Sequence, residues 1–228
     1  MAILTCDNHA RPPGIPPEPD DWTRMTALDL MRSDAPYAVS YLDMPNDLQP
    51  RAQRLCWRFN QLDPTDLEGR AAILGELFGT WHPRATVKPT FRCDYGFNIH
   101  FHGFALVNYN CAFLDTSPIH VGVGTFIAPG CVLACAGHAV HPAQRSEGIQ
   151  TSAPITLGDN VWLGANVTVC GGVTIGDGSV IGAGSVVTRD VPAGVIAAGV
   201  PCRVIREVGE DDLVKRLAQV ERAAAEGR

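Results

Sequence analysis

An aliphatic residue recurs at every sixth position through much of the second half of the chain, with one interruption. The series is Val121, Ile127, Leu133, Leu157, Leu163, Val169, Ile175, Ile181 and Val187. Eight of these residues are followed, four positions later, by a second set of small or β-branched residues. This set is Thr125, Cys131, Val161, Val167, Val173, Ser179, Ser185 and Val191. This period is typical of a hexapeptide β-helix, in which each hexad is a short strand and a turn. We therefore predict a mainly β prism that buries two side chains per hexad and is stable only when its coils stack.

The interruption lies between Leu133 and Leu157, which are four whole hexads apart. The segment Ala136–Ala153 has no hexad pattern and contains His138, His141 and Arg145. We interpret it as a polar loop extruded from the coils, and long loops on repeat scaffolds are often functional. Such a loop has little of its own chain to face, so we expect it to pack on a neighbouring subunit.

The flanking segments divide the chain further. Residues 1–22 are rich in proline and predict an extended arm, whereas residues 23–80 predict a helical cap over one end of the prism. In this cap, Asp47–Leu62 has helical spacing, and a capping box from Thr65 to Glu68 opens a second helix. The β-helix is expected over residues 81–206. Residues 207–228 predict a C-terminal helix, centred on Glu210–Glu226, with acidic residues in its first turn.

Composition restricts the possible partners. The hydrophobic fraction of 46% supports a packed core, and the net charge of −6 without a run of Lys or Arg disfavours nucleic acid and anionic membranes. There is no apolar run long enough to span a bilayer and no secretory signal pattern, so we expect a cytoplasmic protein. The eight cysteines form no CxxC pair, and we expect them to be structural.

Five motifs follow one another in an order that resembles a known family. They are Phe91–Ile99 (FRCDYGFNI), Asn108–Asp115 (NYNCAFLD), Gly137-His138, Val180–Pro192 (VIGAGSVVTRDVP) and Gly199–Arg206 (GVPCRVIR). Together they closely resemble the maltose/galactoside O-acetyltransferase family of hexapeptide acyltransferases, over about residues 41–206. The resemblance implies a left-handed parallel β-helix, a homotrimer and active sites between subunits that use acetyl-CoA.

The resemblance also implies roles for single residues on the acceptor side. His138 matches the family's catalytic histidine, a general base for which imidazole suits neutral pH. Asn108 matches an acceptor-site asparagine, and Asp115 resembles an acceptor-site carboxylate, although both residue types also fill β-helix corners. Asp43 is the best match to an aspartate near the N-terminal helices, and Gln150 stands where a relative has an apolar acceptor contact.

A second group of residues corresponds to the family's coenzyme A site. Small residues let the pantetheine arm lie close to the coils, and arginines can bind its phosphates through several hydrogen bonds. The matching residues are Trp162, Ala165, Ala183, Thr188, Arg189, Arg203 and Arg206. The resemblance implies acetyl-CoA as cosubstrate and no metal.

Two other functions remain open from the sequence. Hexapeptide β-helices also form zinc hydratases of the γ-carbonic anhydrase type, and several histidines are available for three-histidine coordination: His100, His102, His120, His138 and His141. A non-catalytic trimeric scaffold would keep the hexads, but it needs neither the loop histidine nor the arginine set. The acceptor is expected to be a small hydroxyl compound such as a sugar, and its identity is not determined by these motifs.

Overall fold

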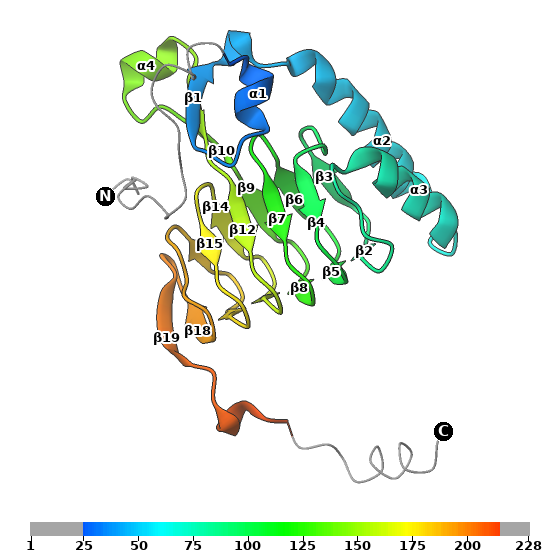
Figure 1. The fold of residues 1–228 in the computed structure, drawn as a ribbon, viewed down its shortest axis with the longest axis vertical. Coiled ribbons are helices and arrows are strands. Elements are labelled where there is room, and N and C mark those ends of the chain that lie inside the picture. Colours follow the sequence, from blue (N-terminus) through cyan, green and yellow to red (C-terminus); the bar gives the residue numbers. More distant parts are fainter. Residues whose placement is uncertain (1–24, 215–228) are drawn as a thin grey trace.

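The computed structural model describes residues 25–214, which form a parallel β-helix with helices at one end (Figure 1). The first four coils each contribute one strand to each of three faces, and the last coils contribute to fewer faces. Face I contains β2 (Thr86–Val87), β5 (Ala105–Val107), β8 (Thr125–Ile127), β13 (Trp162–Leu163), β16 (Val180–Ile181) and β18 (Val195–Ala198), with antiparallel β19 (Arg203–Glu207) at its edge. Face II contains β3 (Phe91–Cys93), β6 (Cys111–Leu114), β9 (Val132–Ala134), β14 (Thr168–Cys170) and β17 (Val186–Val187). Face III contains β4 (Ile99–Phe101), β7 (Ile119–Val121), β12 (Ile155–Leu157) and β15 (Thr174–Ile175).

The periodic residues line the inside of this prism, as the hexads predict. All nine aliphatic positions are at most 1% exposed, and the eight small or β-branched positions are at most 7% exposed. Equivalent residues stack from coil to coil, for example Ile127 beside Leu163 and Leu163 beside Ile181. The predicted parallel β-helix is therefore confirmed.

Coil length changes only at one corner, the II–III corner between faces II and III. Stacked residues are 20 positions apart in the first coils, as in Phe101 and Val121, and 18 apart after the insertion, as in Leu157 and Ile175. In the last coil they are 16 apart, as in Ile175 and Val191. Between these coils Val121 stacks on Leu157, because an insertion leaves and re-enters at the II–III corner. The longer first coils explain why the hexad pattern begins only at Val121 in the sequence.

The insertion is an ordered hairpin. Strands β10 (Ala136–His138) and β11 (Ile149–Ser152) pair antiparallel, with the short helix α4 (Pro142–Ser146) between them. Strand β1 (Tyr37–Ser40) pairs with the other edge of β11, so the order is β1-β11-β10. The insertion therefore faces its own chain on one edge, contrary to our premise. Its packing on a neighbouring subunit stays a prediction.

The helical cap forms as expected, with one difference at a helix start. Its elements are α1 (Ala27–Met31), the 3-10 turns η2 (Tyr41–Asp43) and η3 (Asn46–Leu48), α2 (Gln49–Gln61) and α3 (Leu67–Leu77). Helix α2 packs on β3 and buries Ala52, Leu55 and Phe59 in the core of the prism. The N-cap of α3 is Asp66 rather than Thr65, because the Asp66 carboxylate accepts the Gly69 N–H at 2.9 Å. Thr65 instead donates to Asp63.

The predicted C-terminal helix begins differently from our expectation. Glu210–Asp212 form a single 3-10 turn (η4), and Leu213 and Val214 are not helical. The Asp212 carboxylate caps this turn by accepting the Gly209 N–H and also binds Arg206, which favours a closed turn over a helical first turn. The rest of that prediction and the N-terminal arm lie outside the described residues. None of the helices within residues 25–214 is long and apolar enough to cross a bilayer.

Candidate active site

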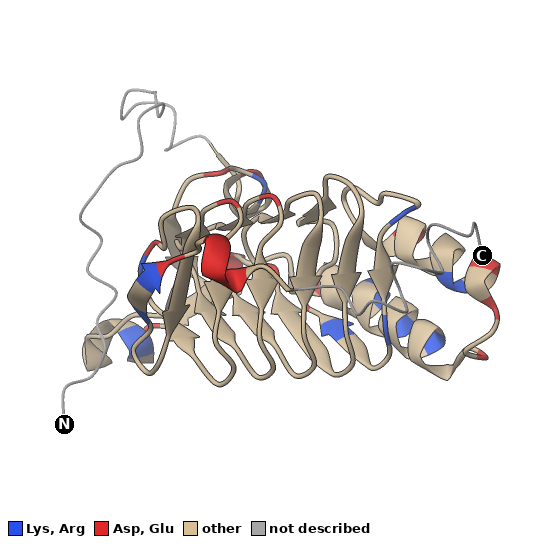
Figure 2. Cartoon of the chain, turned by 90° about the horizontal axis from the view of Figure 1, so that it is seen from below, with Lys and Arg blue, Asp and Glu red and all other residues tan. Residues whose placement is uncertain are grey.

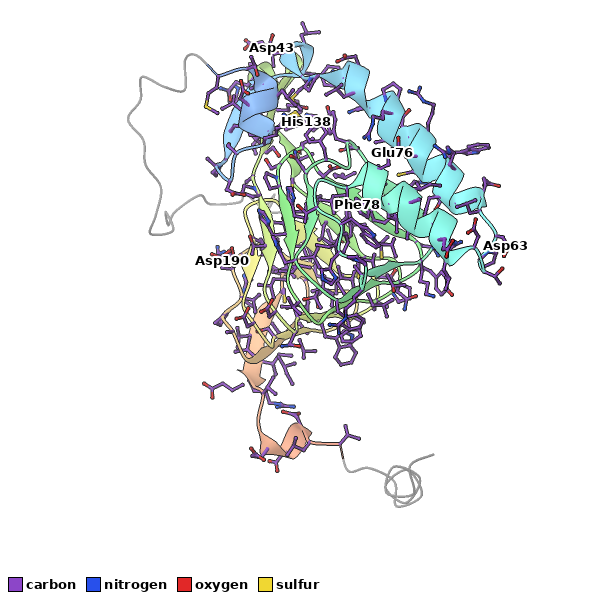
Figure 3. All side chains as sticks on the ribbon, turned by 45° about the vertical axis from the view of Figure 1, so that its right-hand side comes forward. Asp43, Asp63, Glu76, Phe78, His138 and Asp190 are labelled. Carbon is purple, nitrogen blue, oxygen red and sulfur yellow. The ribbon has the colours of Figure 1, made fainter. Side chains whose placement is uncertain are left out.

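His138 is the last residue of β10, at the outer end of the inserted hairpin. It is exposed, and its register partner on β11 is Gln150, so the two side chains share one face of the small sheet. Asp43 follows β1 directly on η2 and is also exposed. Figure 3 shows Asp43 and His138 at the same end of the molecule. The structure thus brings together three of the predicted residues: His138, Gln150 and Asp43.

Buried polar contacts, which the sequence did not reveal, fix this hairpin to the prism. The Tyr37 hydroxyl donates to the Thr116 carbonyl at 2.6 Å, and burial raises the pKa of Tyr37 to about 12. The Ser152 hydroxyl lies 2.7 Å from the Thr116 hydroxyl and 2.8 Å from that of Ser117, and it donates to the Cys135 carbonyl. These partners are 17 to 79 positions apart, and no local sequence pattern predicts such contacts.

Asp115 lies inside the II–III corner and is fully buried. Its carboxylate accepts the backbone N–H groups of Asp94 at 3.1 Å, Tyr95 at 2.9 Å and Asn98 at 3.3 Å. Asn98 in turn donates to the Met31 and Asp115 carbonyls, which connects the corner to α1. Burial, the largest cause, raises the pKa of Asp115 to about 7 against the opposing effect of the amide donors. This geometry favours the structural interpretation of Asp115 over an acceptor contact.

Asn108 lies at the I–II corner, whereas the hairpin leaves the prism at the II–III corner. Its side-chain oxygen accepts the Tyr109 N–H at 2.9 Å. Beside it is an open, largely apolar groove of about 350 Å³ lined by Leu106, Asn108, Phe126, Ile127, Ala128 and Trp162. Trp162 and Phe126 are 54% and 43% exposed, which is unusual for such large apolar side chains. Asn108 therefore stands at the end of a surface that is suited to an organic ligand or a second protein surface.

The predicted coenzyme A residues fall into two sets. Ala165 and Ala183 occupy the I–II corner, with Trp162 beside them on β13 and Arg203 and Arg206 on β19, all on or next to face I. Thr188 and Arg189 follow β17 at the II–III corner. Figure 3 shows Asp190, the neighbour of Arg189, lower on the prism than His138. Arg203 and Arg189 are exposed, whereas Arg206 forms a two-pronged ion pair with Asp212 at 2.6 and 2.7 Å.

The candidate residues therefore occupy opposite edges of face II. We call the residues at the I–II corner and on face I the coenzyme edge: Asn108, Trp162, Ala165, Ala183, Arg203 and Arg206. We call those at the II–III corner and on the hairpin the histidine edge: His138, Gln150, Asp43, Thr188 and Arg189. The strands of face II are about three residues long, so the two edges are roughly 10 Å apart. The hairpin extends outward from the histidine edge and adds to this separation. One chain does not bring His138 to Asn108.

Three of the histidines considered for a zinc site lie together on or beside face III, whereas His138 lies on the inserted hairpin. The rings of His100 and His120 stack with centroids 5.2 Å apart, and His102 Nε2 is 3.1 Å from His120 Nδ1. His120 Nε2 also lies 2.9 Å from the Asp34 carboxylate. Burial, followed by the nearby His120, lowers the pKa of His100 and His102. Within residues 25–214 there is no group of three or more potential ligands arranged to hold a metal ion.

Two family models match the chain in the places that the structure gives to coils and cap. The bacterial transferase hexapeptide model matches residues 154–189, and the maltose acetyltransferase capping motif matches residues 46–82. Galactoside O-acetyltransferase of Escherichia coli is 44% identical over 162 residues, covering 71% of this chain and 80% of that protein. The chain belongs to the maltose/galactoside O-acetyltransferase family. It is therefore an acyltransferase, which confirms the predicted family and enzyme class and favours acyl transfer over the hydratase and the scaffold.

Further members of the family support this assignment. Nodulation protein L of Rhizobium meliloti is 43% identical over 64% of this chain and 80% of that protein. The crystal structure of a maltose O-acetyltransferase from Clostridium difficile has a TM-score of 0.74 at 39% identity, covering 82% of this chain and 99% of that chain. A galactoside acetyltransferase solved in complex with coenzyme A has a TM-score of 0.70 at 41% identity, covering 75% and 86%.

The buried Asp115 carboxyl predicts a pH dependence of stability. Its pKa of about 7 exceeds its ordinary value of 3.8, so the folded protein keeps this proton at pH values where the unfolded chain has lost it. The contribution of Asp115 to stability is complete below about pH 4 and is lost as the pH rises to about 7. We expect Asp115→Asn to remove this slope from the free energy of unfolding, measured by chemical denaturation at several pH values.

The matched control is Asp190→Asn, because the exposed Asp190 accepts the Thr174 N–H at another turn of the same corner. This variant should retain the slope of the unmodified protein. An unchanged slope in Asp115→Asn would show that Asp115 does not titrate in this range.

Proposed function

We propose that the protein transfers the acetyl group of acetyl-CoA to a hydroxyl of a sugar or another small acceptor, with His138 as general base. The observation that supports this proposal most is the position of His138. It is held at the exposed end of an ordered hairpin, in register with Gln150 and at the same end as Asp43. An exposed imidazole on a rigid element can reach a ligand that binds beside it.

The proposed chemistry is direct transfer in a ternary complex. His138 takes the proton from the acceptor hydroxyl as that oxygen attacks the thioester carbonyl. The tetrahedral intermediate then expels the coenzyme A thiolate, which takes up the proton from the imidazolium. The new ester bond replaces the thioester bond, and no covalent enzyme intermediate is needed because the thioester is already activated.

We assign acetyl-CoA binding to residues on both edges of face II. Members of the family have been solved with coenzyme A and with acetyl-CoA, the latter in a protein from Vibrio cholerae with 35% identity. The small Ala165 and Ala183 allow close approach to the backbone at the I–II corner, beside the exposed Trp162. The exposed Arg203 and Arg189 are available for phosphates, whereas Arg206 would have to exchange Asp212 for a phosphate.

We further propose a homotrimer in which each active site is built by two chains. Face II separates the two edges within one chain, so a symmetric ring would place the coenzyme edge of one subunit against the histidine edge of the next. Such head-to-tail contacts use two different surfaces and close into a ring. The exposed Phe126 and Trp162 lie at the edge that such an interface would cover.

The acceptor can be found by a direct screen. Purified protein is mixed with acetyl-CoA and one candidate acceptor, and the released thiol is measured. Galactosides and maltose are the first candidates, because relatives are named for them, and simple alcohols and amines serve as controls. If thiol release is fastest with an amine and no hydroxyl compound is accepted, O-acetylation is wrong.

The general-base role predicts the effect of His138→Ala. Turnover with the best acceptor should fall roughly 10²-fold or more, since general-base catalysis typically contributes ~10²–10⁴-fold. Acetyl-CoA should still bind, as measured by calorimetry, because none of the residues assigned to acetyl-CoA binding is changed. His141→Ala is the control, since this exposed histidine lies three residues further along the same loop. Near-normal turnover in His138→Ala would reject the assignment, and depletion of a bound metal in that variant would favour the hydratase.

The shared site predicts recovery of activity in mixed trimers. One subunit carries His138→Ala and the other Asn108→Ala, so each chain has one damaged edge. After equal mixing, three quarters of the trimers contain both chains and each of these has one intact cleft, so about one quarter of all clefts should work. Steady-state turnover of refolded, tag-purified mixtures measures this. Absence of recovery in verified mixed trimers would place both residues in a cleft of one chain, and a monomeric mass would exclude the shared site.

A further inference from the structure

Arg145 closes the loop that follows His138. Its Nη1 nitrogen donates to the carbonyl of Ala139 at 3.0 Å and to that of Val140 at 2.9 Å. Both residues follow His138 directly, beyond the end of β10, and the Val140 carbonyl lies past the last bond between β10 and β11. One guanidinium nitrogen therefore binds the carbonyls of the two residues that follow His138 in the chain.

The chain just after His138 is also held by β11. The Ala139 N–H donates to the Ile149 carbonyl at 3.1 Å, and the Ala139 side chain is buried. Val140 is 59% exposed, so apolar packing cannot fix it. The bond from Arg145 is a polar contact that holds the chain at this point, and a charged donor makes it stronger than a neutral hydrogen bond.

Arg145 itself is anchored by a short helix. It lies in the last turn of α4, where its N–H donates to the His141 carbonyl and its carbonyl accepts the Gly148 N–H, both at 3.1 Å. The Gly148 carbonyl in turn accepts the Tyr41 N–H at 2.8 Å, next to η2 and Asp43. The Arg145 side chain thus connects a backbone segment that is fixed on β1 and β11 to the residues that follow β10.

We propose that Arg145 is a positioning residue for His138, acting through the carbonyls of Ala139 and Val140 rather than on the substrate. The inference rests on the proposed role of His138 as general base. An imidazole displaced by about 1 Å can lose roughly 10²-fold in rate, because proton transfer requires hydrogen-bond distance in the transition state. Lysine can donate to the same carbonyls but lacks the planar, preorganised guanidinium.

The test compares Arg145→Ala, Arg145→Gln and Arg145→Lys, using acetyl-CoA and the acceptor that the screen identifies. We expect Arg145→Ala to lower kcat by about 10- to 100-fold and to leave the KM for acetyl-CoA within about two-fold, since none of the residues assigned to acetyl-CoA binding is changed. Arg145→Lys should recover most of the lost turnover. Arg145→Gln, which retains one amide donor group, should fall between them and decides the question if the alanine variant does not fold.

The control is Arg51→Ala. Arg51 is also an exposed arginine that donates to a carbonyl, that of Glu76 at 2.6 Å, but it lies on α2. This variant should have normal kcat. Thermal melting of all variants shows whether any loss of turnover follows from unfolding.

A double variant separates positioning from general disruption. If Arg145 acts only through His138, adding Arg145→Ala to His138→Ala should cause no further loss of the residual rate. Full additivity of the two losses, or kcat of Arg145→Ala within about three-fold of normal, would overturn the inference while His138→Ala still confirmed the general base. Normal turnover in His138→Ala itself would overturn both the general base and the role of Arg145.

Discussion

The stacking of inward side chains between successive coils is the constraint on which the structure depends. Each strand is only two to four residues long in the body of the prism, so a coil has no stability of its own and must place its apolar residues directly over those of its neighbours. Large rings must alternate with small residues in this stacking. Phe91 lies in register with Cys111 and Phe113 with Cys93, and the two rings meet edge to face with centroids 5.2 Å apart. Changes in chain length are therefore accepted only where the chain leaves the strands.

The II–III corner takes up all of these changes among the stacked coils, and it is also where polar groups become buried. A wide turn exposes backbone N–H groups that no strand ladder satisfies, and Asp115 accepts three of them. Hydroxyls of Thr116, Ser117 and Ser152 bind one another where the hairpin leaves the prism. The corner that accommodates the changes in coil length thus also anchors the hairpin that carries His138.

The candidate site residues are distributed over two edges of this scaffold rather than gathered at one place. Figure 2 shows that the strands carry few charged residues and that charges gather on the helices and the C-terminal end. A prism with few charged residues on its strands, with a histidine at one edge of face II and small residues and arginines at the other, is suited to assembly into a ring. In that arrangement the function depends on how the faces meet, and the repeat mainly sets the spacing of the groups.

The sequence by itself determined the prism, the cap and the position of the insertion, because hexad burial and helical spacing are local patterns. The insertion is eighteen residues long, a multiple of six, so the hexad pattern stays in phase along the sequence. The stacking of Val121 on Leu157 does not itself require this length, because the insertion leaves the coils at the corner. Only the tertiary structure decided that Asp115 is buried, that β1 completes the hairpin sheet, that Arg206 binds Asp212 and that Arg145 holds the loop after His138. These contacts depend on which turns and edges meet after folding, and hydrogen bonds made outside the regular strands and helices leave no periodic trace in the sequence.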